Sequence, residues 1–299
     1  MKTLTQAQVN LAVNQAIAKV YEAPLRPLES NMLIPRGTNG VPEGAESFSW
    51  DEITAFGMAK IVDRYAKDLP PVGFTFTKKF AGTHIIGDSF SHSFFDLQNA
   101  AFAGIPLKTK QGVLARNAAL LEQDRIALEG DAKAKDTGFI NDANVSVVSV
   151  TNGSWAGGTT TGDQIVDDFQ TVVDAIKTAS NSTENPDSVA IPSNVYAYLN
   201  NHRITGDGDA PRILQYLKDS FPGIKNWYSC DCLKGAGVNG ADRIVVYTKS
   251  EDAVMNIVPM EYTMLQEQWA GLAATVNGVM VSGGTVFFRP LSAAYADIN

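Results

Sequence analysis

The sequence predicts an α+β protein in which strands and helices gather in separate stretches of the chain. Residues 46–82 carry two segments of alternating aromatic and polar residues, and residues 106–129 form the longest helical pattern. Residues 161–255 alternate between short strands and helices. The 299 residues suffice for one large domain or two lobes, and 44% hydrophobic with 19% charged residues is a globular composition.

The N-terminal part predicts a helix followed by an extended arm. A capping box at Thr5–Gln8 opens a helix with an apolar stripe, which ends before Pro24. Residues 24–44 then hold four prolines and three glycines with little periodicity. Because so long a stretch without secondary structure is unusual inside a compact domain, we expect an arm that lies on a neighbouring subunit.

Residues 46–82 predict a long two-stranded excursion. Aromatic residues alternate with polar ones over residues 47–50 and again over residues 74–80, as in strands. Between them, residues 58–69 show the apolar spacing of an amphipathic helix, which Pro70 and Pro71 end. An isolated hairpin is marginal in water, so we expect its aromatic face to pack against another subunit.

The middle of the chain predicts two helices and a strand. A short helix covers 95–103, and a helix of roughly 36 Å covers residues 106–129, with a proline at its first position and Gly130 after its end. Val145–Val150 is rich in β-branched residues and predicts a strand. The Gly- and Thr-rich residues 151–162 predict a loop.

Residues 161–255 predict a compact α/β lobe. A second capping box, Thr161–Gln164, opens its first helix. After residue 256 the chain becomes β-rich again, through Val276–Phe288. The elements expected in the rest of the lobe are the strand Ser188–Ile191, the helices Asn194–Asn200 and Pro211–Ser220, and the strand Arg243–Thr248.

Charge and cysteine content exclude several classes of protein. The 24 basic and 32 acidic residues give a formal charge of −8, and an acidic chain is a poor sequence-independent binder of phosphate backbones. We expect no membrane span, because no run of about 18 apolar residues occurs. Two cysteines exclude a disulfide scaffold and suit a reducing compartment.

The segment Ile85-Ile-Gly-Asp-Ser89 is similar to the first block of the Gly-Asp-Ser esterases, in which Ser89 would be the nucleophile. Such a serine needs a histidine base oriented by an aspartate, which those enzymes place near the C-terminus. Here the last histidine is His202, and His92 lies only three residues from Ser89. We therefore interpret the segment as a turn and keep a hydrolase as an alternative.

The remaining motifs have structural explanations. Gly235–Gly240 matches G-x-G-x-x-G, but it precedes a strand instead of opening a helix, so we expect a loop. Cys230 and Cys232 lack the second pair of a zinc site and are interpreted as two inert thiols. Asp207-Gly-Asp209 is explained by turn chemistry. The three histidines show no ligand spacing.

Four parts of the chain carry a resemblance to a known family. Their order and spacing over residues 45–299 resemble the major capsid proteins of tailed bacteriophages, whose Hong Kong 97 fold is shared by encapsulin shells. The parts are Ile61–Pro70, Gln98–Leu107, Ala127–Gly130 together with Thr137–Asn141, and Arg289–Asp297.

The resemblance implies a Hong Kong 97-like capsid fold with an N-terminal arm, an extended loop, a peripheral domain with a long spine helix, and an α/β axial domain. The implied assignment is arm 1–45, extended loop 46–84, peripheral domain 85–160 and 256–299 with spine helix 106–129, and axial domain 161–255.

The resemblance also implies a function. The chain would be no enzyme, with no catalytic, cofactor-binding or metal-binding residues. It would self-assemble through pentamers and hexamers into an icosahedral virion shell around phage DNA, without sequence-specific binding or a membrane. Portal, scaffolding and decoration proteins are its implied partners, and assembly is expected in the host bacterial cytoplasm. An encapsulin-type bacterial compartment and the Gly-Asp-Ser hydrolase are the alternatives.

Overall fold

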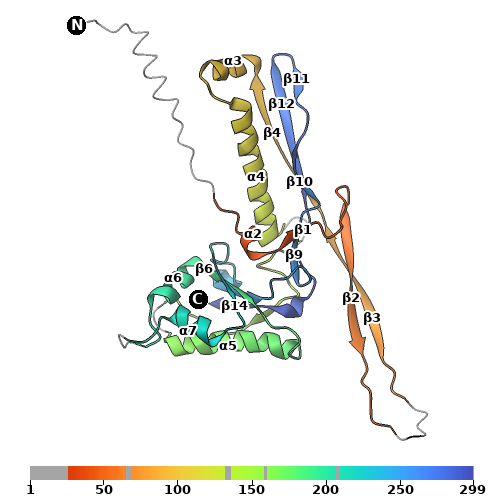
Figure 1. The fold of residues 1–299 in the computed structure, drawn as a ribbon, viewed down its shortest axis with the longest axis vertical. Helices are drawn as coiled ribbons and strands as arrows, with labels where there is room; N and C mark the ends of the chain where they lie inside the picture. The colour runs from red at the N-terminus through yellow and green to blue at the C-terminus, as the bar shows by residue number, and fades with distance from the viewer. Residues whose placement is uncertain are drawn as a thin grey trace. The chain divides into compact units, whose positions relative to one another are not determined.

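The computed structural model describes residues 26–298 apart from 63, 65–68, 132–135, 158–159 and 206–208 (Figure 1). The helix expected from Thr5 and most of the Asp207–Asp209 turn lie outside this part. The described chain forms two compact units. The first comprises chiefly residues 87–121 and 262–279, and the second comprises residues 29–86, 122–261 and 280–298.

Helices and strands both contribute to each unit, as an α+β fold requires. The helices are α2 (Ser30–Leu33), α3 (Phe94–Phe102), α4 (Leu107–Glu129), α5 (Gly162–Ala179), α6 (Ser193–Asn201) and α7 (Ile213–Ser220), with 3-10 turns η1 (Val238–Gly240) and η2 (Pro290–Ser292). The strands are β1 (Arg36–Gly37), β2 (Ser47–Phe56), β3 (Gly73–Gly82), β4 (His84–Ser93), β5 (Ser146–Val148), β6 (Ser188–Pro192), β7 (Asn226–Cys230), β8 (Asp242–Tyr247), β9 (Val254–Ile257), β10 (Met260–Met264), β11 (Gln268–Ala270), β12 (Ala273–Ser282), β13 (Gly284–Phe287) and β14 (Ala293–Ile298).

A mixed five-stranded sheet in the order β5-β14-β8-β6-β7 forms the centre of the second unit. Successive residues of its strands face opposite sides, and both sides are covered. In β8, Ile244 and Val246 join the apolar cluster formed with α5, α6 and α7, whereas Val245 and Tyr247 join a cluster on the other side. Burial on both sides explains why this strand reads as a continuous apolar run in the sequence.

Helix α5 begins at the predicted capping box. The backbone N–H of Thr161 donates to the side chain of Gln164 at 2.9 Å, and the N–H of Gln164 donates to the Thr161 hydroxyl at 3.4 Å. Phe169, Val172 and Ile176 then recur at helical spacing and are buried against the sheet. The capping box and the stripe together confirm the expected helix.

The second face of this sheet is covered partly by residues from the predicted arm. Leu33 and Ile34 are buried in that cluster, and the hydroxyl of Tyr247 donates to the carbonyl of Leu33 at 2.6 Å. Strand β1 pairs in parallel with β9. The expectation that residues 24–44 lack secondary structure is therefore wrong, because a few apolar residues among the prolines suffice to anchor the segment in its own chain.

Helix α4 ends where the sequence predicts, and the following loop closes its C-terminus. Gly130 has a φ of +77°, the left-handed conformation typical of a helix end. The side chain of Asn141 donates to the carbonyl of Glu129 at 2.9 Å and accepts from the N–H of Gly138 at 2.6 Å. The first bond satisfies a carbonyl group that the end of the helix leaves free, and the second fixes the loop that follows.

Strands β2 and β3 pair antiparallel over their whole length, from Ser47 opposite Gly82 to Phe56 opposite Gly73, which confirms the predicted hairpin (Figure 1). The helix expected over residues 58–69 is wrong for the described residues 58–62, which have no helical structure. Their apolar side chains are exposed. Helical spacing alone does not stabilise so short a helix when nothing buries its stripe.

The first unit contains the sheet β10-β12-β11, to which β4 adds by pairing with β12. Helix α3 begins at a capping box of Ser93 and Asp96, which confirms the helix expected there. None of the described helices is long and apolar enough to cross a membrane.

Candidate functional site

The β2–β3 hairpin has two apolar surfaces on opposite faces. Residues directly opposite each other in an antiparallel pair share a face, and Phe48 pairs with Ala81 whereas Ile53 pairs with Phe76. The odd-numbered residues of β2 and the even-numbered residues of β3 therefore form one face. The aromatic residues do not form the single face that we expected.

One face packs on the body of the second unit. Phe48 and Trp50 contact the buried cluster of Met255, Ile257 and Val286. The ring of Trp50 also meets that of Phe288 edge to face, with centroids 5.6 Å apart. This half of the hairpin thus has a core within its own chain.

The other face is uncovered within the described chain. The exposed fractions are 62% for Ile53, 62% for Phe74, 59% for Phe76 and 71% for Phe80. Phe74 and Phe76 touch only edge to face, with centroids 5.1 Å apart. Ile53, Phe74 and Phe76 are neighbours on this face, and the Asp51–Lys78 pair separates them from Phe80. Large exposed apolar side chains that gather on one face mark an interaction surface, and we call Ile53, Phe74, Phe76 and Phe80 the hairpin apolar face.

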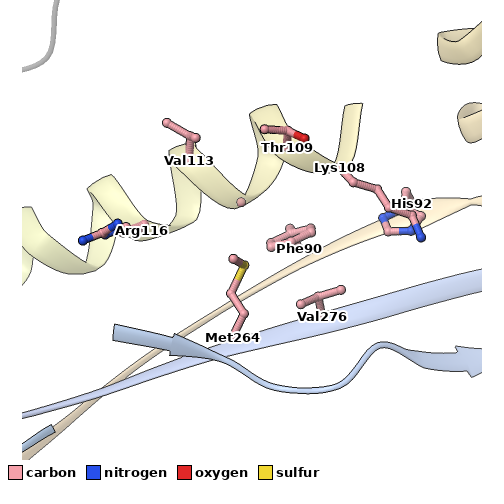
Figure 2. A pocket seen from close by; sticks show the side chains of 9 residues that line it. Phe90, His92, Lys108, Thr109, Val113, Arg116, Met264 and Val276 are labelled. Carbon is pink, nitrogen blue, oxygen red and sulfur yellow. The ribbon is translucent and has the colours of Figure 1, made fainter. Parts of the chain in front are cut away.

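The first unit contains a cavity of about 450 Å³ (Figure 2). Helix α4 contributes one wall, and strands β4, β10 and β12 contribute the other. Most of its surface is apolar, and its two cationic side chains are Lys108 and Arg116. The lining residues are Phe90, His92, Lys108, Thr109, Gly112, Val113, Arg116, Met264 and Val276.

A charged cluster lies at one end of this cavity. Glu267 accepts from Lys108 Nζ at 2.8 Å, and its other oxygen lies 2.6 Å from Nε2 of the buried His92. The hydrogen bond from Lys108 lowers the pKa of Glu267; burial opposes this effect, and the contact with His92 adds to it. The cluster connects α4, β4 and the segment before β11.

Aromatic side chains are also exposed beside this sheet. Helix α3 buries none of its residues, although Phe94, Phe95 and Phe102 are among them. Trp269 and Leu272 in and after β11 are likewise exposed. The first unit therefore leaves a second apolar surface uncovered.

The candidate nucleophile does not lie in a catalytic arrangement. Residues 85–89 are part of the continuous strand β4, so the predicted turn is wrong: pairing with β12 keeps this segment extended. Ser89 and His92, three residues apart on one strand, face opposite sides. Asp88 accepts from the hydroxyl of Tyr262 at 2.8 Å, and burial together with this bond raises the pKa of Tyr262 to about 12.

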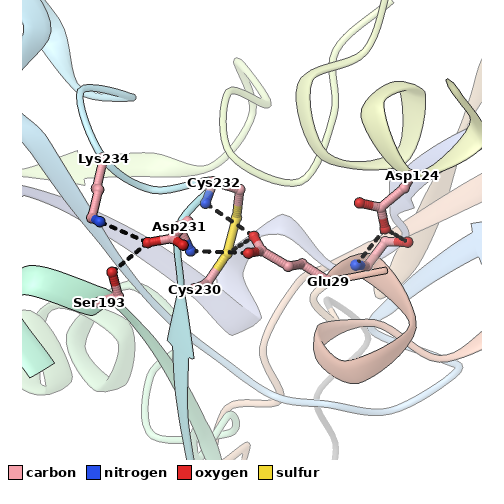
Figure 3. The surroundings of a disulfide bond; sticks show 8 residues. Glu29, Asp124, Ser193, Cys230, Asp231, Cys232 and Lys234 are labelled. Atoms are coloured by element: carbon pink, nitrogen blue, oxygen red, sulfur yellow. Dashed lines mark hydrogen bonds and ion pairs between the residues drawn. A yellow bond between two sulfur atoms is a disulfide. The ribbon is translucent and has the colours of Figure 1, made fainter. Parts of the chain in front are cut away.

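The cysteines differ from expectation. Cys230 and Cys232 are joined by a disulfide instead of standing as two thiols (Figure 3). The sequence shows the spacing of the pair, but the backbone turn that brings the two sulfur atoms together is a property of the loop after β7. The two cysteines and Glu29 also form the one group of three candidate metal-ligand residues in the described part of the chain.

The other motifs have structural roles. Gly235–Gly240 is a loop with a 3-10 turn before β8, as predicted. The histidines lie apart and have different partners: His84 contacts Asp136 at 2.6 Å, and the ring of His202 stacks on a neighbouring tyrosine. In the described residues they share no ligand position.

The segments that carry the resemblance include two structural devices. Thr137–Asn141 closes the end of α4. In Arg289–Asp297, the C-terminal strand β14 lies between β5 and β8, and Asp297 accepts from Arg243 Nε at 2.6 Å and from its Nη2 at 2.9 Å. Tyr295 donates to the carbonyl of Phe139 at 2.7 Å, which ties this strand to the same loop.

Comparisons with known proteins agree with this fold. The capsid of the Myoviridae phage XM1 superposes with a TM-score of 0.79 at 14% identity, covering 94% of this chain and 95% of that one. A structure from Mycobacterium phage Bobi gives 0.66 at 13% identity, covering 100% and 99%. A virus-like particle from Pyrococcus furiosus gives 0.54 at 13%, covering 98% and 99%. Among curated proteins, none matches this sequence.

The family is shown by sequence as well. The model of the family described as major capsid protein matches residues 57–298, which is most of the chain. The structural matches confirm the Hong Kong 97-like fold, and the encapsulin-type alternative has no better support. The chain therefore belongs to the major capsid protein family of tailed bacteriophages.

Proposed function

We propose that this capsid protein forms a closed icosahedral shell of pentamers and hexamers around phage DNA, and that the hairpin apolar face binds a neighbouring copy. The single observation that carries the contact is the exposure of Ile53, Phe74, Phe76 and Phe80 on one face of a hairpin whose other face packs on its own chain through Phe48 and Trp50. Burial of apolar area is the main driving force of association, at about 25 cal/mol per Å².

The four-part domain assignment belongs to this proposal. Residues 46–84 serve as the extended loop, residues 106–129 as the spine helix and residues 161–255 as the axial domain around the ring axes. Contacts around a ring are head to tail and close by rotation, so one surface meets a different surface of the next copy. A hairpin with one apolar face packed on its own chain and the other uncovered suits such a contact.

The proposed shell performs no chemistry. Ser89 has no histidine partner among the described residues, and the family is one of structural proteins. The net charge of −8 favours loose confinement of DNA over tight binding. Assembly in the host cytoplasm and contacts with portal, scaffolding or decoration proteins complete the proposal.

The test is assembly of the purified full-length chain, followed by light scattering and negative-stain microscopy. We expect particles or capsomers for the wild type, and loss of both for the double variant Phe74→Asp, Phe76→Asp. The matched control is Thr75→Asp, which places one charge on the opposite face of the same strand. Circular dichroism should be unchanged for all three proteins, because these side chains are exposed.

Two results would contradict the proposal. One is a wild-type chain that stays monomeric at every concentration and salt. The other is normal assembly of the double variant, which would show that the hairpin apolar face lies outside the contact.

A further inference from the structure

The loop after β7 is closed by a disulfide between Cys230 and Cys232, with Asp231 between them (Figure 3). Cys230 is 1% exposed, whereas Cys232 is only partly buried. Outside the ring, the side chain of Asp231 pairs with Lys234 at 2.7 Å. A covalent ring this small restricts the backbone of all three residues, so the N–H groups within it have a fixed direction.

Those N–H groups meet a carboxylate from a distant part of the chain. Glu29 is 8% exposed, and it accepts from the N–H of Asp231 at 3.2 Å and from the N–H of Cys232 at 3.0 Å. The same carboxylate lies 2.8 Å from Sγ of Cys230. Figure 3 shows Glu29 directed at the disulfide from the start of α2. A buried, charged carboxylate needs such hydrogen-bond donors, because the free energy of burying the charge without them is unfavourable.

Glu29 is the first residue of a segment that is held in the second unit. Immediately after it, the N–H of Ser30 donates to Asp124 at 2.8 Å. Leu33 and Ile34 are buried in the core cluster. The bonds from Glu29 to the loop are thus part of what holds residues 29–34 in the second unit.

We propose that Cys230 and Cys232 form a thiol–disulfide switch that sets how firmly Glu29, and with it the segment of residues 29–34, is held. In the oxidised state the ring keeps both N–H groups on the carboxylate. In the reduced state the loop gains backbone freedom, and the two bonds to Glu29 weaken.

The chemistry of the switch is a balanced exchange. Oxidation takes two protons and two electrons from the two thiols, and a low-molecular-weight disulfide such as oxidised glutathione accepts them and becomes two thiols. Reduction by a dithiol reverses this reaction. An external thiolate attacks the more accessible sulfur, that of Cys232, and the sulfur of Cys230 leaves as a thiolate.

Glu29 also affects the rate of that reduction. The leaving thiolate at Cys230 forms beside the carboxylate, and repulsion between like charges makes it a poorer leaving group. The disulfide should therefore resist reduction while Glu29 is charged and in place. This dependence is specific to the observed contact, since a remote carboxylate would have no such effect.

The switch goes beyond the proposed function and is defined within one chain. One consequence does rest on the proposed function: residues 29–34 would be held less firmly in a shell assembled in a reducing cytoplasm than in a shell kept in an oxidising medium. The experiments below use the dissociated full-length chain, so their failure is distinguishable from a failure to assemble.

The first experiment compares the oxidised and reduced wild-type chain. After oxidised glutathione, intact mass should fall by two hydrogens and alkylation should be lost. After a phosphine reductant, hydrogen exchange over residues 29–34 should become about 10-fold faster, and residues 162–179 in helix α5 serve as the internal control. Because this comparison uses the wild type, it does not depend on the folding of a variant.

The second experiment measures the rate of reduction by dithiothreitol. Glu29→Gln should be reduced about 5-fold faster than the wild type, because the leaving thiolate no longer meets a negative charge. Glu43→Gln makes the same chemical change at an exposed position and should match the wild type. A double variant, Cys230→Ser with Cys232→Ser, should exchange like the reduced chain in either buffer.

Three outcomes would overturn the proposal. The first is two alkylatable thiols after treatment with oxidised glutathione. The second is equal exchange over residues 29–34 in both redox states. The third is tight binding of one Zn²⁺ by the reduced chain with slower exchange of that segment, which would make Glu29, Cys230 and Cys232 a metal site instead.

Discussion

At the scale of single residues, Gly138 shows how one position is determined by a close approach. A Cβ built there would lie 2.3 Å from the carbonyl oxygen of Leu128, which is far below any normal contact. The same turn lets Asn141 bond the carbonyl of Glu129. The glycine is therefore required by the packing of the loop on the end of α4.

We expect Gly138→Ala to lower the free energy of unfolding by about 1–3 kcal/mol, because the backbone must shift to relieve the contact. Urea denaturation with circular dichroism measures it. Gly223→Ala is the matched control, since no atom lies within 4 Å of a Cβ built there. Equal stability of the two variants would show that the loop adapts without cost.

The ion pair of Arg243 and Asp297 predicts a dependence on pH. Burial opposes ionisation of Asp297, but the hydrogen bonds from Arg243 and from the N–H of Val238 outweigh it, so the pKa of Asp297 lies below its ordinary value. A lowered pKa in the folded state contributes stability above the ordinary value of 3.8, and this contribution is lost as the pH falls through the folded pKa.

Asp297→Asn should accordingly be less stable than the wild type at pH 7, by about 2 kcal/mol, and the difference should shrink below pH 3.8. Urea denaturation at pH 7, 4 and 3 measures the difference. If the difference in the free energy of unfolding between the two proteins stays constant over that pH range, the charge of Asp297 does not contribute to stability through the ion pair.

At the scale of elements, the β2–β3 hairpin is divided between two functions. Trp50 on one face packs with Phe288 and the buried cluster, whereas Phe76 on the other face is 59% exposed. Alternation along both strands produces this division, because successive side chains point to opposite sides. One face holds the hairpin to its own chain and leaves the other available.

Two substitutions separate these roles in the dissociated chain. Trp50→Ala should lower the free energy of unfolding by about 1–2 kcal/mol, because packed aromatic area is lost from a partly buried site. Phe76→Ala should change it by less than about 0.5 kcal/mol, because the ring is largely exposed. Thermal denaturation of both variants tests this, and a larger loss for Phe76→Ala would reverse the assignment of the faces.

At the scale of the whole molecule, exposed apolar side chains recur in both units. The hairpin apolar face lies in the second unit, and Phe102 with its neighbours lies in the first. Single exposed apolar residues are normal on proteins, but rows of them indicate surfaces that another molecule covers. In the proposed shell, further copies of the chain would cover these surfaces.

Limited proteolysis should show whether a neighbouring copy covers the hairpin. Lys60 and Arg64 near the hairpin end are exposed, so trypsin should cut there in the dissociated chain. In assembled particles the cut should slow by at least about 10-fold if a neighbouring copy lies over the hairpin. Gel electrophoresis of timed digests measures the rates, and Lys218 in α7 is a reference site. Equal rates in both states would place the hairpin outside the contacts.

The sequence alone determined the kind and extent of several elements. The capping box at Thr161, the glycine after α4 and the apolar run of β8 are local signals, because propensity and periodicity depend on neighbours along the chain. The order and spacing of the four segments also indicated the major capsid protein family, because both can be read directly from the sequence.

Contacts between distant residues were decided only by the tertiary structure. Which aromatic residues of the hairpin are covered depends on strands more than 200 residues away, and the partner of Cys230 depends on a backbone turn. The apolar residues among 58–62 formed no helix, because no surface in the described part of the chain buries them. A periodic apolar pattern predicts that one side of an element is buried. The surface that buries it belongs to another part of the fold or to another molecule.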